Sequence, residues 1–599
     1  MNTAALYHRP ESEFCYLYKD GSVHVRLRTA KDDIQSVKLI YADPYKWASS
    51  GVGNADNTNS TNYWVYETKK MKKLLSDETS DFYQTEVTVP TKRMDYVFVV
   101  EDQKGKKFVY TDKGVLPYKK SLLKSKYAAF RLPYFHQVDA YHAPSWVRDM
   151  VWYQIFPERF ANGDTSNDPE KVKDWSDQAP DRQDFYGGDL QGVLDHLDHL
   201  VDLGVNGIYF CPIFKSPTNH KYDTEDYLEI DPHFGTKELF KTLVEEAHKR
   251  GLKVMLDAVF NHIGDTSPFW QDVLQNQEHS KYAAWFHVNS WPVVGDEDPD
   301  NFENSTNLTF DTFAFTPHMP KLNTANPEVQ AHLLHIAEYW IREFDIDAWR
   351  LDVADEVDHQ FWKKFRTTCD AAKKDFYILG EVWHSSQPWL NGDEFSAVMN
   401  YAYTGAISDF FVKRKISMPQ MISAINDQLM LYRKETSTVM FNCLDSHDTP
   451  RFLTECKEDK NLFKQVEAFT YLNPGSPCIY YGDEVGLTGG MDPDCRRPMI
   501  WDEDKQDKDL YAFFKDLVAF RKENAELLAD GTMDWCVVSE SNGVLQLERK
   551  LGKKRLIGTF NTGKKAVDGD LKGVLLSNRA KIDGKHVTIK PKGFVISRG

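Results

Sequence analysis

The segment FDIDAWRLDVADEVDH, residues 344–359, begins like a buried strand but carries a charged pair, Arg350 and Asp352. Residues two apart in a strand point to the same face, so both side chains should reach the same pocket. A neighbouring arginine favours the ionised form of a carboxyl. An ionised carboxylate that faces a pocket can act as a nucleophile. The alternative is a buried ion pair that only holds two strands together.

A second carboxyl, Glu381, follows the apolar run FYILG, which predicts the next strand. Near other negative charges its pKa should be raised, so that it can stay protonated and act as an acid. One ionised and one protonated carboxyl on either side of a pocket is the arrangement that cleaves glycosidic bonds.

Two more apolar segments end in polar side chains. LKVMLDAVFNH supplies Asp257, Asn261 and His262, and STVMFNCLDSHD supplies His447 and Asp448. A single Asp at a strand end is more often a turn former or a helix N-cap. Four strands that end in this way are hard to explain by capping, so the sequence predicts a shared site.

Alternating elements must bring these strand ends together. From residue 146 onward, short apolar runs alternate with amphipathic helical segments such as NPEVQAHLLHIAEYWIREF. About eight strand–helix units predict the α/β class and a closed (β/α)8 TIM barrel, whose active site lies at the carboxyl ends of the strands. A doubly wound open sheet is the competing fold, but no G-x-G-x-x-G follows any strand.

The remaining segments predict further domains. Residues 1–125 alternate like strands, and 126–145 resemble a linker. The sixty or so residues between two barrel elements are too long for an ordinary loop and predict a small inserted domain. The expected boundaries are 1–125 all-β, 126–145 linker, 146–262 and 326–515 barrel, 263–325 inserted domain, and 516–599 C-terminal helix and β-sandwich.

Composition narrows the partners and the compartment. A net charge of −17 opposes binding to nucleic acid or to an anionic membrane. No run of 18 apolar residues predicts a membrane helix, and the first residues lack a signal-peptide core. Eight cysteines without C-x-x-C spacing are typical of free thiols in a reducing cytoplasm. We therefore expect a cytoplasmic protein.

The strand-end motifs resemble those of a known family. DAVFNH (257–262), WRLDVADEV (349–357), GEVWH (380–384) and LDSHD (444–448) resemble the four ordered motifs of the α-amylase superfamily of glycoside hydrolases. MPKLN (319–323), NHKYDTEDY (219–227) and YYGDEVGLTGGMDPDCRRPMIW (480–501) resemble the cyclomaltodextrinase, neopullulanase and maltogenic amylase subfamily. That group carries an N-terminal β-sandwich, and the segment ALYHRPESEFCYLY resembles the start of that domain.

The resemblance implies a role for each catalytic residue. Asp352 would be the nucleophile of a covalent glycosyl intermediate, Glu381 the acid and then the base, and Asp448 the stabiliser of the transition state. The reaction would retain the anomeric configuration, with the two catalytic carboxyls roughly 5–5.5 Å apart. Further expected substrate-binding or supporting residues are Tyr222, Asp257, His262, Arg350, Trp383, His447, Asp492 and Arg496.

The expected roles of these further residues differ. His262 and His447 would hydrogen-bond the sugar, Tyr222 would stack beneath it, and Arg350, supported by Asp257, would keep Asp352 ionised. Asp492 and Arg496 would bind the next unit on the non-reducing side, and Trp383 would line the acceptor side. Asp355 departs from the family, where Asn is usual, so it could shift the pH optimum or the acceptor preference.

The implied activity is cleavage of α-1,4 bonds in cyclomaltodextrins, linear maltodextrins and, as a further candidate, pullulan, with some transglycosylation. Neopullulanase or maltogenic amylase activity, 4-α-glucanotransferase activity and α-1,6 debranching remain alternatives, because acceptor-side residues separate them. A non-catalytic relative is disfavoured because all three catalytic carboxyls are present. In the family, the N-terminal domain of one subunit closes over the active site of another, which implies a homodimer.

The loop FANGDTSNDP (160–169) places Asn162, Asp164, Asn167 and Asp168 close together. Such a density of oxygen ligands suits Ca²⁺, although Asn, Asp and Gly also dominate plain turns. Similar loops in the subfamily bind calcium with help from a YGGD segment, which here supplies Gly187 and Asp189. We therefore expect a structural calcium ion.

Overall fold

The computed structural model describes residues 1–49, 62–141, 143–176, 178–293 and 308–599. The chain divides into two compact units, one made of Met1–His142 with Ile416–Glu435 and the other of Ala143–Lys415 with Thr436–Gly599. Part of the expected inserted domain, residues 294–307, lies outside the described residues.

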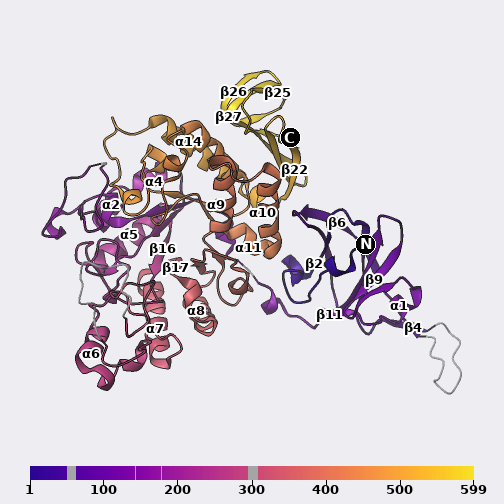
Figure 1. Ribbon diagram of the computed structural model, residues 1–599, viewed down its shortest axis with the longest axis horizontal. Helices are drawn as coiled ribbons and strands as arrows, with labels where there is room; N and C mark the ends of the chain where they lie inside the picture. The colour runs from indigo at the N-terminus through magenta and orange to yellow at the C-terminus, as the bar shows by residue number, and fades with distance from the viewer. Residues whose placement is uncertain (50–61, 142, 177, 294–307) are drawn as a thin grey trace. The chain divides into compact units, whose positions relative to one another are not determined.

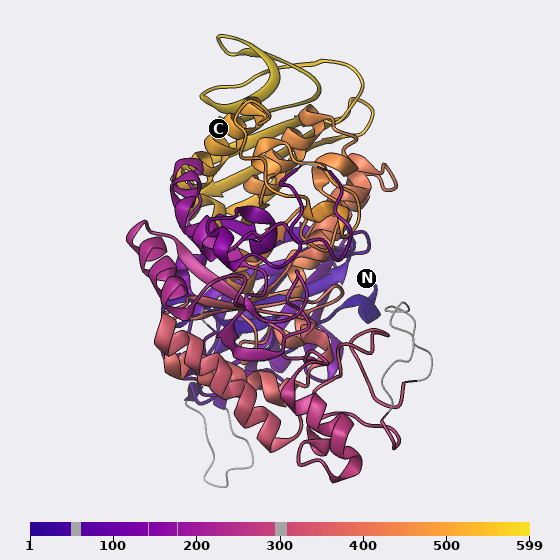
Figure 2. The same cartoon turned by 90° about the vertical axis from the view of Figure 1, so that its left-hand side faces the viewer.

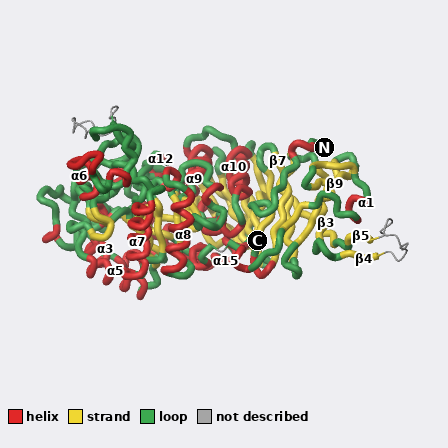
Figure 3. The backbone as a smooth tube through the Cα atoms, turned by 90° about the horizontal axis from the view of Figure 1, so that it is seen from below, coloured by secondary structure: helices red, strands yellow, loops and turns green. Residues whose placement is uncertain are grey.

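The N-terminal unit is built mainly from antiparallel strands (Figure 3). Its main sheet follows the order β1-β2-β7-β6-β3-β8-β9-β10, with β11 paired to β8. Alternate residues such as Val23, Val25 and Leu27 are fully buried, as the period of two in a strand predicts. The strands are β1 (Cys15–Leu17), β2 (Ser22–Ala30), β3 (Ile34–Ala42), β6 (Glu67–Ser76), β7 (Ser80–Thr88), β8 (Met94–Asp102), β9 (Lys107–Thr111), β10 (Gly114–Pro117) and β11 (Phe130–Leu132).

Smaller elements complete this unit. Strands β4 (Trp47–Ser49) and β5 (Asn62–Trp64) form a separate antiparallel pair, and α1 (Lys120–Lys124) is a short helix. Helix α10 (Met418–Leu431) also belongs here, where Met430 packs on Phe14 and Phe82.

The larger unit contains a closed barrel of eight parallel strands. Its order β19-β18-β17-β16-β13-β12-β21-β20 follows the chain around a ring, and a parallel bridge between Met399 and Phe441 closes it. The predicted (β/α)8 TIM barrel is therefore confirmed. The strands are β12 (Trp152–Ile155), β13 (Gly207–Phe210), β16 (Lys253–Ala258), β17 (Ala348–Leu351), β18 (Tyr377–Gly380), β19 (Ala397–Val398), β20 (Phe441–Cys443) and β21 (Ser476–Tyr480).

Amphipathic helices cover the outside of the barrel strands (Figure 1). The predicted apolar face of α7 (Pro327–Phe344) is buried, including Leu333 and Trp340. Asn326 caps this helix by accepting a hydrogen bond from the Glu328 N–H, and Pro327 occupies its first turn. Other helices are α3 (Leu190–Asp195), α4 (Leu197–Leu203), α5 (Lys237–Lys249), α8 (His359–Ala372), α9 (Tyr401–Ile407), α11 (Lys434–Val439), α12 (Phe452–Glu455) and α13 (Lys460–Leu472).

The connection between β16 and α7 has its own aromatic core. Trp270 of α6 (Pro268–Asn276) packs against Phe286 at 4.7 Å and Phe310 at 4.6 Å between ring centroids. A bridge between His262 and Lys321 ties the end of this connection back to the segment that follows β16. The inserted segment therefore forms one wall above the barrel strands.

An antiparallel sheet ends the chain, next to the orange helices in Figure 2. Helix α14 (Lys508–Glu523) and α15 (Ala525–Asp530) precede it. Its strands are β22 (Thr532–Ser539), β23 (Val544–Leu551), β24 (Lys554–Asn561), β25 (Val567–Asp570), β26 (Val574–Asp583) and β27 (His586–Arg598). The predicted fold class, a barrel that is preceded and followed along the chain by antiparallel β-domains, is confirmed.

Candidate active site

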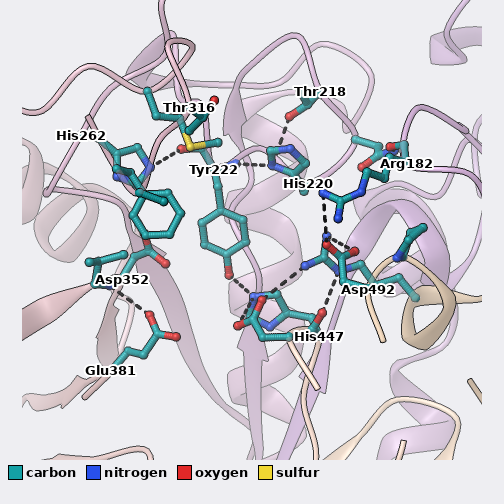
Figure 4. A pocket seen from close by; sticks show the side chains of 18 of the residues that line it. Arg182, Thr218, His220, Tyr222, His262, Thr316, Asp352, Glu381, His447 and Asp492 are labelled. Atoms are coloured by element: carbon teal, nitrogen blue, oxygen red, sulfur yellow. Dashed lines mark hydrogen bonds and ion pairs between the residues drawn. The ribbon is translucent and has the colours of Figure 1, made fainter. Parts of the chain in front are cut away.

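A cavity of about 1360 Å³ lies at the carboxyl ends of the barrel strands (Figure 4). It is lined by Asp352, Glu381 and Asp448, which follow β17, β18 and β20. The structure also places six of the other predicted residues in its wall: Tyr222, His262, Trp383, His447, Asp492 and Arg496. The remaining two, Asp257 and Arg350, are buried beneath it.

Arg350 joins three carboxyls below the cavity. Its Nη1 lies 2.9 Å from Asp257 Oδ1 and 2.8 Å from Asp352 Oδ1, and its Nη2 lies 2.8 Å from Glu381 Oε2. The Arg350 side chain is fully buried. The two candidate catalytic carboxyls are therefore held on the two terminal nitrogens of one guanidinium.

The charge balance at this site differs from the expectation for a simple Arg–Asp pair. Burial raises the pKa of Asp352 well above its usual range, and Arg350 only opposes this effect. Burial likewise raises the pKa of Glu381, again against Arg350. Sequence reasoning placed Arg350 beside Asp352 with support from Asp257, and the structure adds Glu381 as a third carboxyl on the same cation. Close carboxyls that cannot all ionise share protons, which favours one ionised and one protonated group.

Of the three carboxyls around Arg350, Asp257 accepts the most hydrogen bonds. The hydroxyls of Tyr209 and Tyr222 donate to its Oδ2 at 2.7 and 2.9 Å, besides the contact with Arg350. Burial raises the pKa of Asp257 to about 6. Sequence reasoning missed Tyr209, whose signal was a polar ring in the otherwise apolar strand VNGIYF. Asp257 thus anchors Arg350 from below, as expected.

Aromatic side chains form two faces of the cavity. Trp383 stacks on Tyr401 at 3.6 Å and 4° between the ring planes, and its Nε1 donates to Glu381 Oε1 at 3.1 Å. Tyr222 lies parallel to His447 at 5.3 Å and 5°. Since the Trp383 side chain is about 50% exposed, a sugar ring can stack on its free face.

His262 is fixed by the inserted segment. Its Nε2 lies 3.1 Å from the carbonyl oxygen of Tyr222, and its ring stacks on Phe313 at 5.1 Å and 23°. Burial lowers the pKa of His262 to about 3, so the ring is neutral near pH 7. A neutral imidazole at the wall can exchange hydrogen bonds with sugar hydroxyls.

Arg496 connects the third carboxyl to the far end of the cavity. It bonds to Asp492 Oδ1 through Nη1 at 2.9 Å, to Asp448 Oδ1 through Nη2 at 3.3 Å, and to the His447 carbonyl through Nε at 2.8 Å. Arg182 also reaches this end, with its Nη1 4.0 Å from Asp492 Oδ2. Arg182 comes from a loop without periodicity, and no sequence signal singled it out.

His220 is a second residue that sequence reasoning did not single out. It lines the cavity, and its Nδ1 accepts a hydrogen bond from the Tyr222 N–H at 3.1 Å. Burial lowers its pKa to about 3, so it is neutral near pH 7. Its position in NHKYDTEDY, two residues before Tyr222, was the available signal.

Asp355, the departure from the family pattern, also lines the cavity. Its carboxylate Oδ2 lies 3.6 Å from His384 Nε2. It is therefore placed where it can touch substrate, and its effect on pH optimum or acceptor preference stays a prediction.

The expected calcium loop holds oxygen atoms that lack partners. The side-chain oxygens of Asn162 and Asn167 are buried and accept no hydrogen bond. Asp168 lies beside them, with its Oδ1 2.8 Å from Asn162 Nδ2. Gly187 is so close that an added Cβ would collide with both Asp168 and Asn162. Oxygen ligands of this kind suit a hard cation.

The other two expected calcium ligands serve the backbone. Asp189 accepts hydrogen bonds from the N–H groups of Gly163, Asp164 and Gly192, which caps α3. Asp164 Oδ1 accepts from Ser166. Within the described residues, no group of three or more His, Cys, Asp or Glu side chains could hold a metal ion. Any calcium ligands here are thus mainly amide and carbonyl oxygens with Asp168.

Comparison with known proteins decides the family. The model described as "Alpha amylase, catalytic domain" matches residues 154–531, and "Alpha amylase, N-terminal ig-like domain" matches residues 1–136. The chain belongs to the alpha-amylase family. The family resemblance drawn from the sequence motifs is therefore confirmed.

Individual members of the alpha-amylase family match nearly the whole chain. An intracellular maltogenic amylase of Bacillus subtilis (strain 168) is 47% identical over 582 residues, which are 97% of this chain and 95% of that protein. A cyclomaltodextrinase of Geobacillus thermopakistaniensis (strain MAS1) is 44% identical over 608 residues, which cover 100% of this chain and 99% of that protein. A solved cyclomaltodextrinase structure aligns with a TM-score of 0.89 and 43% identity over 100% of both chains.

Proposed function

We propose that the chain is a retaining α-glucan hydrolase that cleaves α-1,4 bonds of cyclomaltodextrins and linear maltodextrins, with pullulan as a further candidate substrate and with some transglycosylation. The observation that carries this proposal is the attachment of Asp352 and Glu381 to the two terminal nitrogens of Arg350. This keeps the two carboxyls close together, as a retaining mechanism requires. The names of the similar proteins, maltogenic amylase and cyclomaltodextrinase, support the substrate class.

In the proposed mechanism Asp352 attacks the anomeric carbon, and its bond to that carbon forms as the glycosidic bond breaks. Glu381 gives its proton to the departing oxygen. A water molecule then loses a proton to Glu381 and displaces Asp352, which restores both groups. Asp448, held by Arg496, lies where it can bind sugar hydroxyls in the transition state.

Initial rates on β-cyclodextrin, pullulan and soluble starch, with products identified, test the proposed function. We expect fast opening of β-cyclodextrin and slow hydrolysis of starch. Pullulan or starch as the best substrate favours the neopullulanase or maltogenic amylase alternative. Disproportionation of maltodextrins without net hydrolysis favours 4-α-glucanotransferase, and the absence of all these activities refutes the proposal.

The proposed assembly is a homodimer in the cytoplasm. The N-terminal unit exposes large aromatic side chains, among them Tyr45 at 70% and Tyr134 at 53%. A partner surface would bury such groups favourably. The name of the intracellular relative and the eight free thiols support the compartment. No helix in the described part of the chain is both long and apolar enough to span a membrane.

Sedimentation of the full chain across concentrations tests the dimer. We expect a mass twice that of the 69.3 kDa chain. Tyr45→Ser together with Tyr134→Ser should weaken the dimer. Activity on starch should rise relative to β-cyclodextrin, because the N-terminal unit of the other subunit would no longer close over the cavity. Glu540→Ser, an exposed change in the turn that follows β22, serves as the control. A monomeric wild-type protein contradicts the proposal.

We also propose that Asn162, Asn167, Asp168 and the backbone at Gly187 bind a structural calcium ion. Free calcium at 100 times Kd should stabilise the fold by about 2.7 kcal/mol, seen as a higher midpoint of thermal unfolding than in chelator. Asp168→Asn should remove this difference. Asp181→Asn, an exposed carboxyl on the same connection, should retain it. Equal midpoints with calcium and with chelator for the wild-type protein rule the site out.

A further inference from the structure

Gln154 is a buried amide that none of the mechanism above uses. It lies in β12, is fully buried, and points its Nε2 at Nδ1 of His447 at 2.7 Å. The same nitrogen lies 3.4 Å from Cys211 Sγ. Its amide oxygen is buried without a hydrogen-bond partner. A buried amide that uses one end only is costly, so the N–H end needs an explanation.

The other nitrogen of His447 faces two acceptors. His447 Nε2 lies 2.5 Å from the Tyr222 hydroxyl oxygen and 3.1 Å from Asp448 Oδ2 (Figure 4). Tyr222 donates its proton to Asp257 at 2.9 Å, so its oxygen accepts. A carboxylate also only accepts. His447 Nε2 must therefore carry the proton.

The neutral state of the ring then fixes the remaining nitrogen. Burial lowers the pKa of His447 well below its usual range, with Arg496 and Arg350 adding to the effect. A neutral imidazole carries one proton, so Nδ1 is a bare acceptor. Only the N–H end of the Gln154 amide can donate to that acceptor. The amide oxygen of Gln154 could not, because its lone pairs would face the lone pair of His447 Nδ1. This explains why the amide oxygen is the end left without a partner.

We propose that Gln154 is a positioning residue that holds His447 as the neutral Nε2–H tautomer, with this N–H aimed at Asp448 and at a bound sugar. The inference rests on the proposed hydrolysis, since it assigns a residue to the same site. Around metal-bound histidines, removing the hydrogen bond that fixes the tautomer typically costs about 10- to 100-fold in activity, and we expect a loss of similar size at His447. Gln154 therefore tunes the reaction without touching the substrate.

Two substitutions separate positioning from packing. Gln154→Met keeps the length of the side chain but has no donor, so kcat should fall about 10- to 100-fold with a smaller change in KM. Gln154→Glu can donate to Nδ1 only while the new carboxyl is protonated, so its activity should fall as pH rises through the pKa of that carboxyl. A simple charge effect predicts the opposite, since added negative charge raises the pKa of the acid Glu381 and extends activity to higher pH.

Gln465→Met is the matched control. Gln465 is also fully buried, donates through Nε2 to the carbonyls of Asn561 and Gly593, and leaves its own oxygen without a partner. It lies on α13, away from the cavity lining. Its loss should lower the unfolding midpoint and leave kcat and the pH profile within twofold of the wild-type values. Wild-type-like kcat and pH profiles for both Gln154 variants overturn the proposal.

The tautomer can also be measured directly, even if a Gln154 variant fails to fold. In wild-type protein labelled with ¹⁵N-histidine, the His447 signals are assigned by their loss in His447→Gln. We expect a protonated Nε2 and an unprotonated Nδ1 from pH 6 to pH 8. A proton on Nδ1 overturns the proposal. An enzyme inactive on all three glucans but with the expected tautomer would instead refute the proposed function alone.

Discussion

Asp352→Asn lowers kcat on every α-glucan substrate by a factor on the order of 10⁵ to 10⁶, the scale seen when a covalent nucleophile is removed. The amide keeps the shape of the side chain but cannot attack the anomeric carbon. The change also relieves the crowding of three carboxyls around one guanidinium, so the fold should be preserved or stabilised. Steady-state rates on β-cyclodextrin and the thermal unfolding midpoint measure both effects.

Asp355→Asn is the matched control for this change. Asp355 lines the same cavity three residues away but contacts His384 rather than Arg350. We expect it to keep kcat within about tenfold of the wild-type value, with the effect seen mainly in the ratio of transfer to hydrolysis. If Asp352→Asn retained near-normal hydrolysis, Asp352 would not be the nucleophile.

Glu381→Gln should lower kcat on cyclodextrin about 10²- to 10⁴-fold, as expected when a general acid is lost. The rate at which α-maltosyl fluoride forms the glycosyl-enzyme should change little, because fluoride leaves without a proton. The glycosyl-enzyme should then accumulate, since no base activates water. Added azide should accelerate its breakdown and give an α-glycosyl azide, because azide attacks without a base. A burst of fluoride followed by slow turnover is the measurement.

The pH profile gives an independent check on Glu381. Burial raises the pKa of Glu381, so the acid form persists to higher pH than for an exposed carboxyl. The wild-type rate should fall as pH rises through this pKa, since the proton donor is lost. Glu381→Gln should lack this alkaline limb in its residual hydrolysis of β-cyclodextrin, the substrate whose departing oxygen needs the proton. An unchanged limb in that variant would assign it to another group.

The sequence by itself determined the elements and the candidate residues, because both depend on local patterns. Alternation and helical periodicity predicted the barrel, and Asn326 with Pro327 marked the start of α7. The motif residues follow their strands directly, so strand order alone placed Asp352, Glu381 and Asp448 at one end of the barrel. The buried face of α7 followed from the spacing of its apolar residues.

Only the tertiary structure decided how these residues share charge and protons. The bridge from Met399 to Phe441 that closes the ring, and the reach of Arg182 to Asp492, join residues far apart in the chain. Glu381 joins Asp257 and Asp352 on Arg350 because β16, β17 and β18 lie side by side in the barrel sheet. The burial that raises the pKa of Asp352 and the amide of Gln154 that faces His447 are properties of the packed interior. The order of residue types along the chain does not specify how deeply a side chain is buried or which distant residues it contacts across the barrel.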